Sequence, residues 1–321
     1  MKFQFRQSGC RFFFITISTA GHQPLLSRLV RGVKRPMLTP YGEQVKRIWT
    51  TLNAVDNHLI PSDYIIMPDH LHLLLIVNSS TEYLFSPLVF SHWFMVASSS
   101  SLPRIAKPAS WGKFYSPSEW PTTAQGYVQL FAWEPRIWVE FIWSGRQLSS
   151  VRRYIRMNPE RYFWKLDNPD MFVRRAIVSH SRLSPDYPWT ACGDLTLLAS
   201  PFLYHVRLSM SKSLAEQEAE IGTYTELAAR GCIPVSGFLS PGEREFERRL
   251  KELAHSRWIK TVPYAVPNRF DPSVEDSQYL AAHRELILSS FTEDEAPPFC
   301  IRRDNCLAMN ERIAEMIRKG K

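Results

Sequence analysis

Two histidines, His70 and His72, interrupt an otherwise apolar run over residues 64–77. Their i, i+2 spacing would place both imidazoles on the same face of a β-strand. Two neutral imidazoles in that position can bind one divalent cation, with carboxylate, amide or water oxygens completing the coordination shell. A cation with an open position could accept a substrate oxygen, as metal-assisted catalysis requires. The alternative is a core strand that tolerates two histidines.

A second group of polar residues lies further along the chain, in RRYIRMNPERY. Tyr154 and Asn158 are spaced i, i+4 and would share one helix face. A tyrosine phenol can act as a nucleophile when it loses its proton and a cation neutralises the phosphate that it attacks. Asn158 could offer its carbonyl oxygen to the same cation. The alternative is a half-buried core tyrosine, an asparagine that caps the helix before Pro159, and a solvated basic face.

Arginines flank the tyrosine on this segment, and they would suit contact with a nucleic-acid backbone. They are Arg152, Arg153, Arg156 and Arg161.

The histidine run needs neighbouring elements, and the preceding segments supply them. Residues 11–19 are rich in aromatic and β-branched residues, which predicts a strand. A helix is expected over 39–55, with Thr39 as N-cap, Pro40 in the first turn and apolar residues at helical spacing. The run 64–77 is predicted to be a second strand. A strand, a helix and another strand indicate an α+β fold.

The pattern weakens over residues 78–133, where Pro, Ser and Gly recur without a clear period. This predicts a loop-rich insertion with a short helix at 84–97. Residues 136–143 form another strand candidate. The helix that carries the tyrosine is expected to begin near Ser149, and Pro159 should kink it or end it.

The chain changes character near residue 200, which predicts domains at 1–200 and 201–321. Over 232–266 the pattern of strand, turn, helix and strand indicates a βαβ unit in an α/β domain with a parallel sheet. This region resembles the nucleotide-binding-like domains of DprA and LOG proteins. Small residues at its strand-to-helix turn could leave backbone N–H groups for an anion, although no glycine-rich phosphate motif is present and an accessory role is the alternative. The turn residues are Ser236, Gly237, Ser240 and Gly242.

The composition limits the class of protein. The chain has 39 Lys and Arg against 31 Asp and Glu, and a net charge of +8. This excess fits either a polyanionic partner such as nucleic acid or simply a basic protein. Five scattered cysteines without a CxxC pair argue against a zinc ribbon or a disulfide framework, and they fit the reducing cytoplasm. No apolar run reaches the ~18 residues of a membrane span, so no membrane partner is expected.

The run MPDHLHLLL followed by YIRMNP resembles the REP-associated tyrosine transposases, a branch of the single-tyrosine HUH transposases. The resemblance extends over about residues 8–190. It implies a ferredoxin-like antiparallel sheet and cleavage of single-stranded or hairpin DNA with Mg²⁺ or Mn²⁺. By this resemblance His70 and His72 would bind the metal, and Tyr154 would form a 5′-phosphotyrosine link and release a 3′-hydroxyl. Asn158 would stand where related enzymes can carry a third ligand.

The sequence departs from the family pattern before the tyrosine helix. Val139 and Glu140 stand where a His-Asp-like pair is expected. Glu140 could approach the metal or be an ordinary strand carboxylate, and Asp69 is interpreted as a supporting or turn residue. Two other hypotheses therefore remain: a domesticated DNA-binding protein that has lost cleavage, and a different enzyme whose histidines bind a structural metal. The sequence leaves open whether the protein is a monomer or a homodimer.

Overall fold

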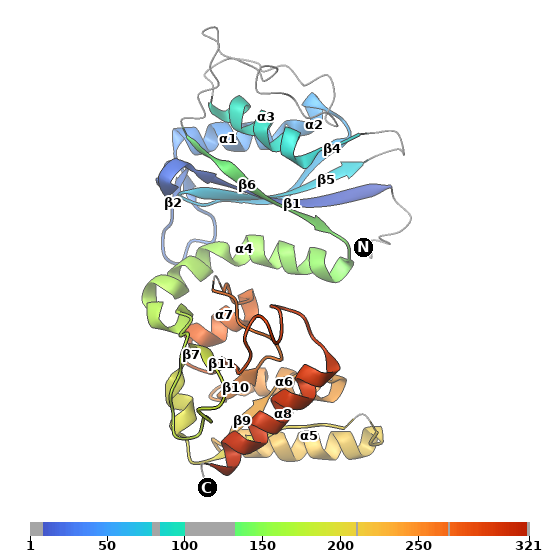
Figure 1. Ribbon diagram of the computed structural model, residues 1–321. Coiled ribbons are helices and arrows are strands. Elements are labelled where there is room, and N and C mark those ends of the chain that lie inside the picture. Colours follow the sequence, from blue (N-terminus) through green and yellow to red (C-terminus); the bar gives the residue numbers. More distant parts are fainter. Residues whose placement is uncertain (1–8, 79–83, 100–131, 210, 269, 320–321) are drawn as a thin grey trace. The chain divides into compact units, whose positions relative to one another are not determined.

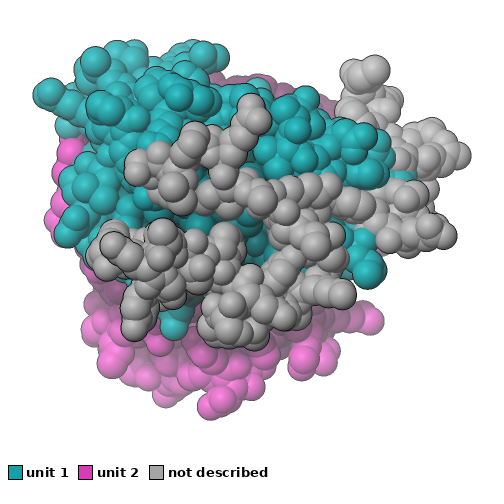
Figure 2. Space-filling model, turned by 90° about the horizontal axis from the view of Figure 1, so that it is seen from above, with its two compact units in different colours: residues 1–163 teal, residues 164–321 magenta. Residues whose placement is uncertain are grey.

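The computed structural model describes residues 9–78, 84–99, 132–209, 211–268 and 270–319. The chain divides into two compact units, residues 1–163 and 164–321 (Figure 2). This division differs from the boundary predicted near residue 200. The reason is that β7 (Thr190–Gly193), which precedes residue 200, pairs antiparallel with β11 (Glu285–Ser289) and so belongs to the second sheet.

Unit 1 contains a four-stranded sheet in the order β4-β5-β1-β6, with every neighbouring pair antiparallel. The chain order of strand, helix, two strands, helix and strand gives this sheet the ferredoxin-like arrangement. The expected α+β class, with an antiparallel sheet in this part of the chain, is therefore confirmed. The four strands are β1 (Cys10–Thr19), β4 (Leu59–Ile66), β5 (His70–Asn78) and β6 (Trp133–Ile142).

The run 64–77 is not one strand, as the sequence suggested, but two strands joined by a turn at residues 67–69. Pro68 has no N–H to donate to a strand ladder, and aspartate favours turns, so the chain reverses there. The backbone N–H of Met67 donates to the carbonyl oxygen of His70 at 2.8 Å and closes the turn. His70 is therefore the first residue of β5.

Helices cover both faces of the sheet in unit 1 (Figure 1). Thr39 caps α1 as predicted, because its Oγ1 accepts a hydrogen bond from the N–H of Gly42 at 3.0 Å. The short helix predicted at 84–97 is α3, and the rest of the predicted insertion, at 79–83 and 100–131, lies outside the described residues. The helices are α1 (Pro40–Thr50), α2 (Leu52–Val55), α3 (Pro87–Ser99) and α4 (Gly145–Asp167).

Alternate residues of the strands pack into two separate apolar clusters, as strand geometry requires. Leu71 and Leu73 of β5 pack with residues of α1 and α3 on one face. Leu74 packs with Val151 and Ile155 of α4 on the other. Since His70 and His72 alternate with the leucines of the first cluster, both histidines lie on the α4 face.

Proline 159 lies inside α4 and does not end it, because the helix continues to Asp167. Pro159 lacks the N–H that would donate to the carbonyl oxygen of residue 155, but the turns on either side remain helical. Asn158 is therefore a mid-helix residue and not a C-cap.

Unit 2 contains a five-stranded sheet in the order β7-β11-β10-β9-β8. The four strands from β8 to β11 pair in parallel, so the predicted βαβ unit and parallel sheet are confirmed. The other strands and α-helices of unit 2 are β8 (Leu203–His205), α5 (Leu214–Ala229), β9 (Ile233–Ser236), α6 (Pro241–Glu252), β10 (Trp258–Thr261), α7 (Val274–Ala281) and α8 (Arg303–Arg318), and unit 1 also has the short strands β2 (Ser27–Arg28) and β3 (Met37–Leu38). Among the described residues no helix combines the length and the apolar character that crossing a bilayer demands.

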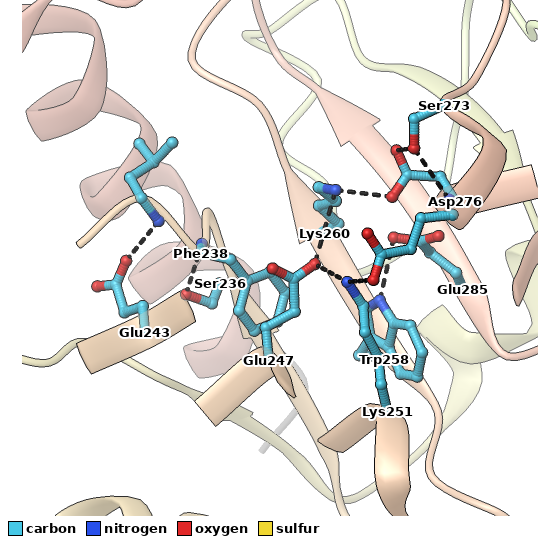
Figure 3. Close-up of polar contacts among 12 residues, drawn as sticks. Ser236, Phe238, Glu243, Glu247, Lys251, Trp258, Lys260, Ser273, Asp276 and Glu285 are labelled. Carbon is cyan, nitrogen blue, oxygen red and sulfur yellow. Dashed lines mark hydrogen bonds and ion pairs between the residues drawn. The ribbon is translucent and has the colours of Figure 1, made fainter. Parts of the chain in front are cut away.

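Ionisable side chains gather beside β10 and β11 in unit 2, where Glu285 is buried and Lys260 and Asp276 are half-buried (Figure 3). Lys260 Nζ lies 2.8 Å from Asp276 Oδ1. Glu285 is fully buried, and its Oε1 accepts a hydrogen bond from Trp258 Nε1 at 3.0 Å. Its Oε2 has no hydrogen-bond partner among the described residues. Burial, followed by the nearby Asp276 carboxylate, raises the pKa of Glu285 to about 8.

We expect Glu285→Gln to remove a pH dependence of stability. Because the folded-state pKa of Glu285 lies above its ordinary value of 4.5, the folded chain holds a proton that the unfolded chain loses. The wild-type free energy of unfolding should therefore fall as the pH rises from about 5 to about 8. Glutamine mimics the neutral acid, so the variant should fall less. Urea denaturation across this range measures both, and parallel curves for variant and wild type would contradict the assignment.

Candidate active site

The structure brings Tyr154 of α4 to the histidine pair of β5. The ring centroids of His70 and His72 are 4.8 Å apart. The ring centroid of Tyr154 is 5.0 Å from that of His72, with the two rings edge to face. The three residues that the sequence linked only through a motif therefore share one site within a single chain.

His72 is held in one orientation by its neighbours. It is 4% exposed, and its ring stacks on Phe14 with centroids 5.4 Å apart. Its Nδ1 lies 2.8 Å from the Thr16 hydroxyl oxygen, whereas its Nε2 is buried and has no hydrogen-bond partner among the described residues. A buried ring nitrogen without a partner costs free energy unless something binds it, which suits a metal ligand.

The electrostatic environment keeps His72 neutral. Burial, and then electrostatic interaction with His70 and Arg161, hold the pKa of His72 well below its ordinary value. A neutral imidazole has an unprotonated nitrogen, which is the form that coordinates a cation.

His70 is oriented by the residue before it. Its Nδ1 lies 2.7 Å from Asp69 Oδ1, and the second oxygen of this carboxylate lies 3.3 Å from His22 Nδ1. The hydrogen bond with His70 is the main reason that the pKa of Asp69 is lowered. A carboxylate that accepts from one ring nitrogen leaves the other, His70 Nε2, for a metal. Asp69 thus orients His70 through this hydrogen bond, which is the role of a supporting residue.

Two further residues of α4 share the face of Tyr154. Asn158 is 7% exposed, and its amide nitrogen has no hydrogen-bond partner among the described residues. Arg161 is 3% exposed, and its guanidinium carbon lies 4.7 Å from the centroid of the Tyr154 ring. Spacings of four and seven residues from Tyr154 bring both side chains to the same stripe of the helix.

The described residues contain no group of three or more His, Cys, Asp or Glu that could hold a metal. A cation at His70 and His72 would therefore need oxygen ligands of another kind to complete its shell. The Asn158 amide and water are of the suitable type.

The four arginines that flank Tyr154, which we call the basic collar, are only partly exposed. Arg153 and Arg156 are exposed. Arg152 is half-buried, with its Nε 3.0 Å from Asp63 Oδ2 in an ion pair. Arg161 does not belong to an exposed collar, because it is buried against Tyr154.

Glu140 is engaged by a neighbouring side chain. Its Oε1 accepts a hydrogen bond from Gln147 Nε2 at 2.5 Å, and the residue pairs with Phe14 across the sheet. This contact is that of an ordinary strand carboxylate.

Two residues of this site were not found from the sequence. Thr16 pairs with His72 on one side and with Trp138 on the other, so the three residues form one row across β5, β1 and β6. Trp138 is 66% exposed, which is unusual for so large an apolar side chain. Period-two alternation in each strand could have given the face of these residues, but only the pairing register places them in one row.

The turn predicted as an anion site in unit 2 is filled by the chain's own carboxylate. Glu243 Oε2 accepts hydrogen bonds from the backbone N–H groups of Leu239 at 2.9 Å and Ser240 at 3.1 Å. Ser236 Oγ accepts from the N–H of Phe238, as Figure 3 shows. A side chain on Gly237 would meet Met309 at 2.6 Å, so this glycine serves close packing. Of the two possibilities left open by the sequence, this occupied turn does not support the vacant anion site.

No protein-family model and no curated protein matches the chain. Among the solved structures that match it are the two weakly similar ones that follow. DNA processing protein A from Helicobacter pylori, described for its single-stranded DNA binding mode, is 18% identical with a TM-score of 0.34, over 46% of this chain and 67% of that one. A REP-associated tyrosine transposase bound to a REP hairpin is 15% identical with a TM-score of 0.28, over 51% and 74%. Neither likeness places the chain in a family.

We expect Thr16→Val to weaken Mn²⁺ binding about 10- to 100-fold, the usual effect of losing a side chain that orients a ligand. Valine keeps the shape of threonine but cannot bond His72 Nδ1, so the imidazole loses its fixed orientation. Titration followed by Mn²⁺ electron paramagnetic resonance measures the affinity. Thr223→Val is the matched control, because that hydroxyl donates only to the Ala219 carbonyl in α5. Equal Mn²⁺ affinity in the two variants would contradict the predicted role of Thr16.

Proposed function

We propose that this protein cleaves and rejoins single-stranded DNA through Tyr154, with a divalent metal at His70 and His72. The observation that carries the proposal is the position of the Tyr154 ring, 5.0 Å from a buried His72 whose Nε2 has no partner among the described residues. A nucleophile of the right type thus lies beside two nitrogens that suit a cation.

The chemistry needs only the chain, the cation and the DNA. The Tyr154 oxygen attacks the scissile phosphorus, and its proton passes to solvent. The bond from phosphorus to the 3′-oxygen breaks, and that oxygen takes up a proton. The products are a 5′-phosphotyrosine link and a free 3′-hydroxyl. The link preserves the energy of the phosphodiester, so another 3′-hydroxyl can reverse the step without a nucleotide cofactor.

His70 and His72 would hold Mg²⁺ or Mn²⁺, with Asn158 or water as further ligands. The bound cation would neutralise the charge of the phosphate and favour in-line attack. Thr16 and Asp69 orient the two imidazoles from behind.

Arg161 would act on the nucleophile itself. Its guanidinium lies over the Tyr154 ring, where it would fix the ring in position for attack. Since Arg161 is buried, water screens this interaction little.

The exposed aromatic ring of Trp138 favours single-stranded DNA as the substrate. Unpaired bases expose their flat faces and stack on aromatic side chains. Trp138 and His72 lie in the same row, two strands apart. Since neighbouring strands are about 4.8 Å apart, the two residues are separated by roughly 10 Å. A base next to the scissile phosphate could reach Trp138.

We expect Tyr154→Phe to abolish the covalent protein–DNA adduct while leaving DNA binding nearly unchanged. The substitution removes the attacking oxygen and keeps the ring. The assay is incubation with Mn²⁺ and single-stranded or hairpin oligonucleotides, followed by denaturing electrophoresis. Tyr162→Phe is the matched control, because Tyr162 is an exposed tyrosine on the same helix. Binding by the wild type without any adduct, across varied oligonucleotides, would instead support a DNA-binding protein that has lost cleavage.

We expect Trp138→Ala to weaken binding of single-stranded DNA about 5- to 100-fold, the cost of losing one base-stacking contact. Fluorescence anisotropy on the Tyr154→Phe background measures binding without cleavage. Trp143→Ala is the control, because Trp143 is 77% exposed but packs on Phe141 of the opposite face, with ring centroids 4.0 Å apart. If both tryptophan variants bind alike, Trp138 is not the stacking residue.

A further inference from the structure

A short basic ribbon projects from unit 1 between β1 and α1. β2 (Ser27–Arg28) pairs antiparallel with β3 (Met37–Leu38), and residues 29–36 form the loop between them. We call residues 27–38 the basic ribbon. No acidic residue occurs from 23 to 42. Its four cations are all exposed, and they are Arg28, Arg31, Lys34 and Arg35.

The base of the basic ribbon is bonded to the turn that precedes His70. The N–H of Leu26 donates to the carbonyl oxygen of Pro68 at 2.9 Å. Ser27 Oγ donates to the carbonyl oxygen of Ile66, also at 2.9 Å. The ribbon therefore begins at the edge of the candidate site.

The loop of the ribbon reaches toward α4, on the same side of the sheet as the histidines (Figure 1). Leu29 packs against the apolar cluster between the sheet and α4. The guanidinium carbon of Arg31 lies 4.8 Å from the centroid of the Phe163 ring. The ribbon therefore extends from the turn that precedes His70 to the turn of α4 that also carries Arg161.

The concentration of positive charge on this loop needs an explanation. Like charges on a short segment repel one another, which disfavours the compact fold unless a polyanion binds. Exposed Val30, Val33 and Met37 alternate with the cations and offer apolar contact to sugars or bases. Gly32, at φ +76°, allows the loop to turn tightly and places cations on both sides of the reversal.

We propose that the basic ribbon binds the DNA backbone next to the phosphate that Tyr154 attacks. This inference rests on the proposed function and deepens it, since it assigns a second contact for the same substrate. Lys34 and Arg35 would each neutralise one phosphate and release its counterions. The ribbon would thereby set the position of the strand relative to the histidines.

The test compares two adjacent pairs of cations in the Tyr154→Phe protein. Lys34→Gln with Arg35→Gln removes two charges from the ribbon. Lys46→Gln with Arg47→Gln removes two from α1, whose residues pack on the opposite face of the sheet. Affinity for an unstructured single-stranded oligonucleotide is measured against salt concentration. Urea denaturation confirms that both variants remain folded.

The ribbon pair should reduce the salt slope of log K by about 1.4, from about 0.7 for each phosphate, and should weaken binding about 25-fold at 0.1 M salt. The α1 pair should change neither quantity. Oligonucleotides with single neutral methylphosphonate linkages then locate the contact. Linkages that weaken binding of the Tyr154→Phe parent, but not of the ribbon variant, should lie next to the cleavage position mapped with the wild type.

The remaining outcomes would contradict either the proposed function or the ribbon inference. If the Tyr154→Phe parent binds no oligonucleotide, the proposed function fails and the ribbon inference fails with it. If the parent binds but the two paired variants behave alike, the ribbon inference alone fails. Loss of binding to anionic phosphatidylserine vesicles with an unchanged DNA salt slope would make the ribbon a lipid contact and overturn the inference. Scattered methylphosphonate effects would place the ribbon elsewhere on DNA and overturn it as well.

Discussion

The register between β1 and β5 is the constraint on which the candidate site depends. Thr16 lies opposite His72, so the hydroxyl that orients the imidazole and the imidazole itself come from paired positions. A slip of one residue would turn His70 and His72 into the apolar cluster with α1 and α3, and would turn Leu71 and Leu73 toward Tyr154. The apolar residues on both faces of β5 therefore determine the positions of His70 and His72 as well as the fold.

The sequence predicted those features that local patterns determine. The strands at 11–19 and 136–143, the Thr39 cap and the βαβ unit of unit 2 follow from alternation, capping and turn residues, and all are present. The α4 face of Tyr154 follows from helical spacing. The row of His72, Thr16 and Trp138 does not, because it joins three strands whose register depends on tertiary packing.

At two places the structure differs from what the local sequence suggested, and each difference has a physical cause. Pro159 was expected to interrupt α4, but packing of Val151 and Ile155 on the sheet and the neighbouring helical turns maintain the helix. The glycine and serine turn of unit 2 could have left backbone N–H groups for an anion, but Glu243 accepts those of Leu239 and Ser240. At Pro159 a contact from elsewhere in the chain decided what the local sequence left open, whereas at the turn the local capping box of Ser240 and Glu243 did so.

The basic ribbon is attached in a way that separates its loop from the candidate site. Its base is attached through the backbone oxygens of Ile66 and Pro68, not through their side chains. Substitutions in the ribbon loop thus leave the His70 turn and the ring nitrogens of His70 and His72 in place. Under the proposed function, the placement of the flanking strand could therefore change separately from the reacting groups, because substitutions in the loop would alter phosphate contacts and leave the histidines unmoved.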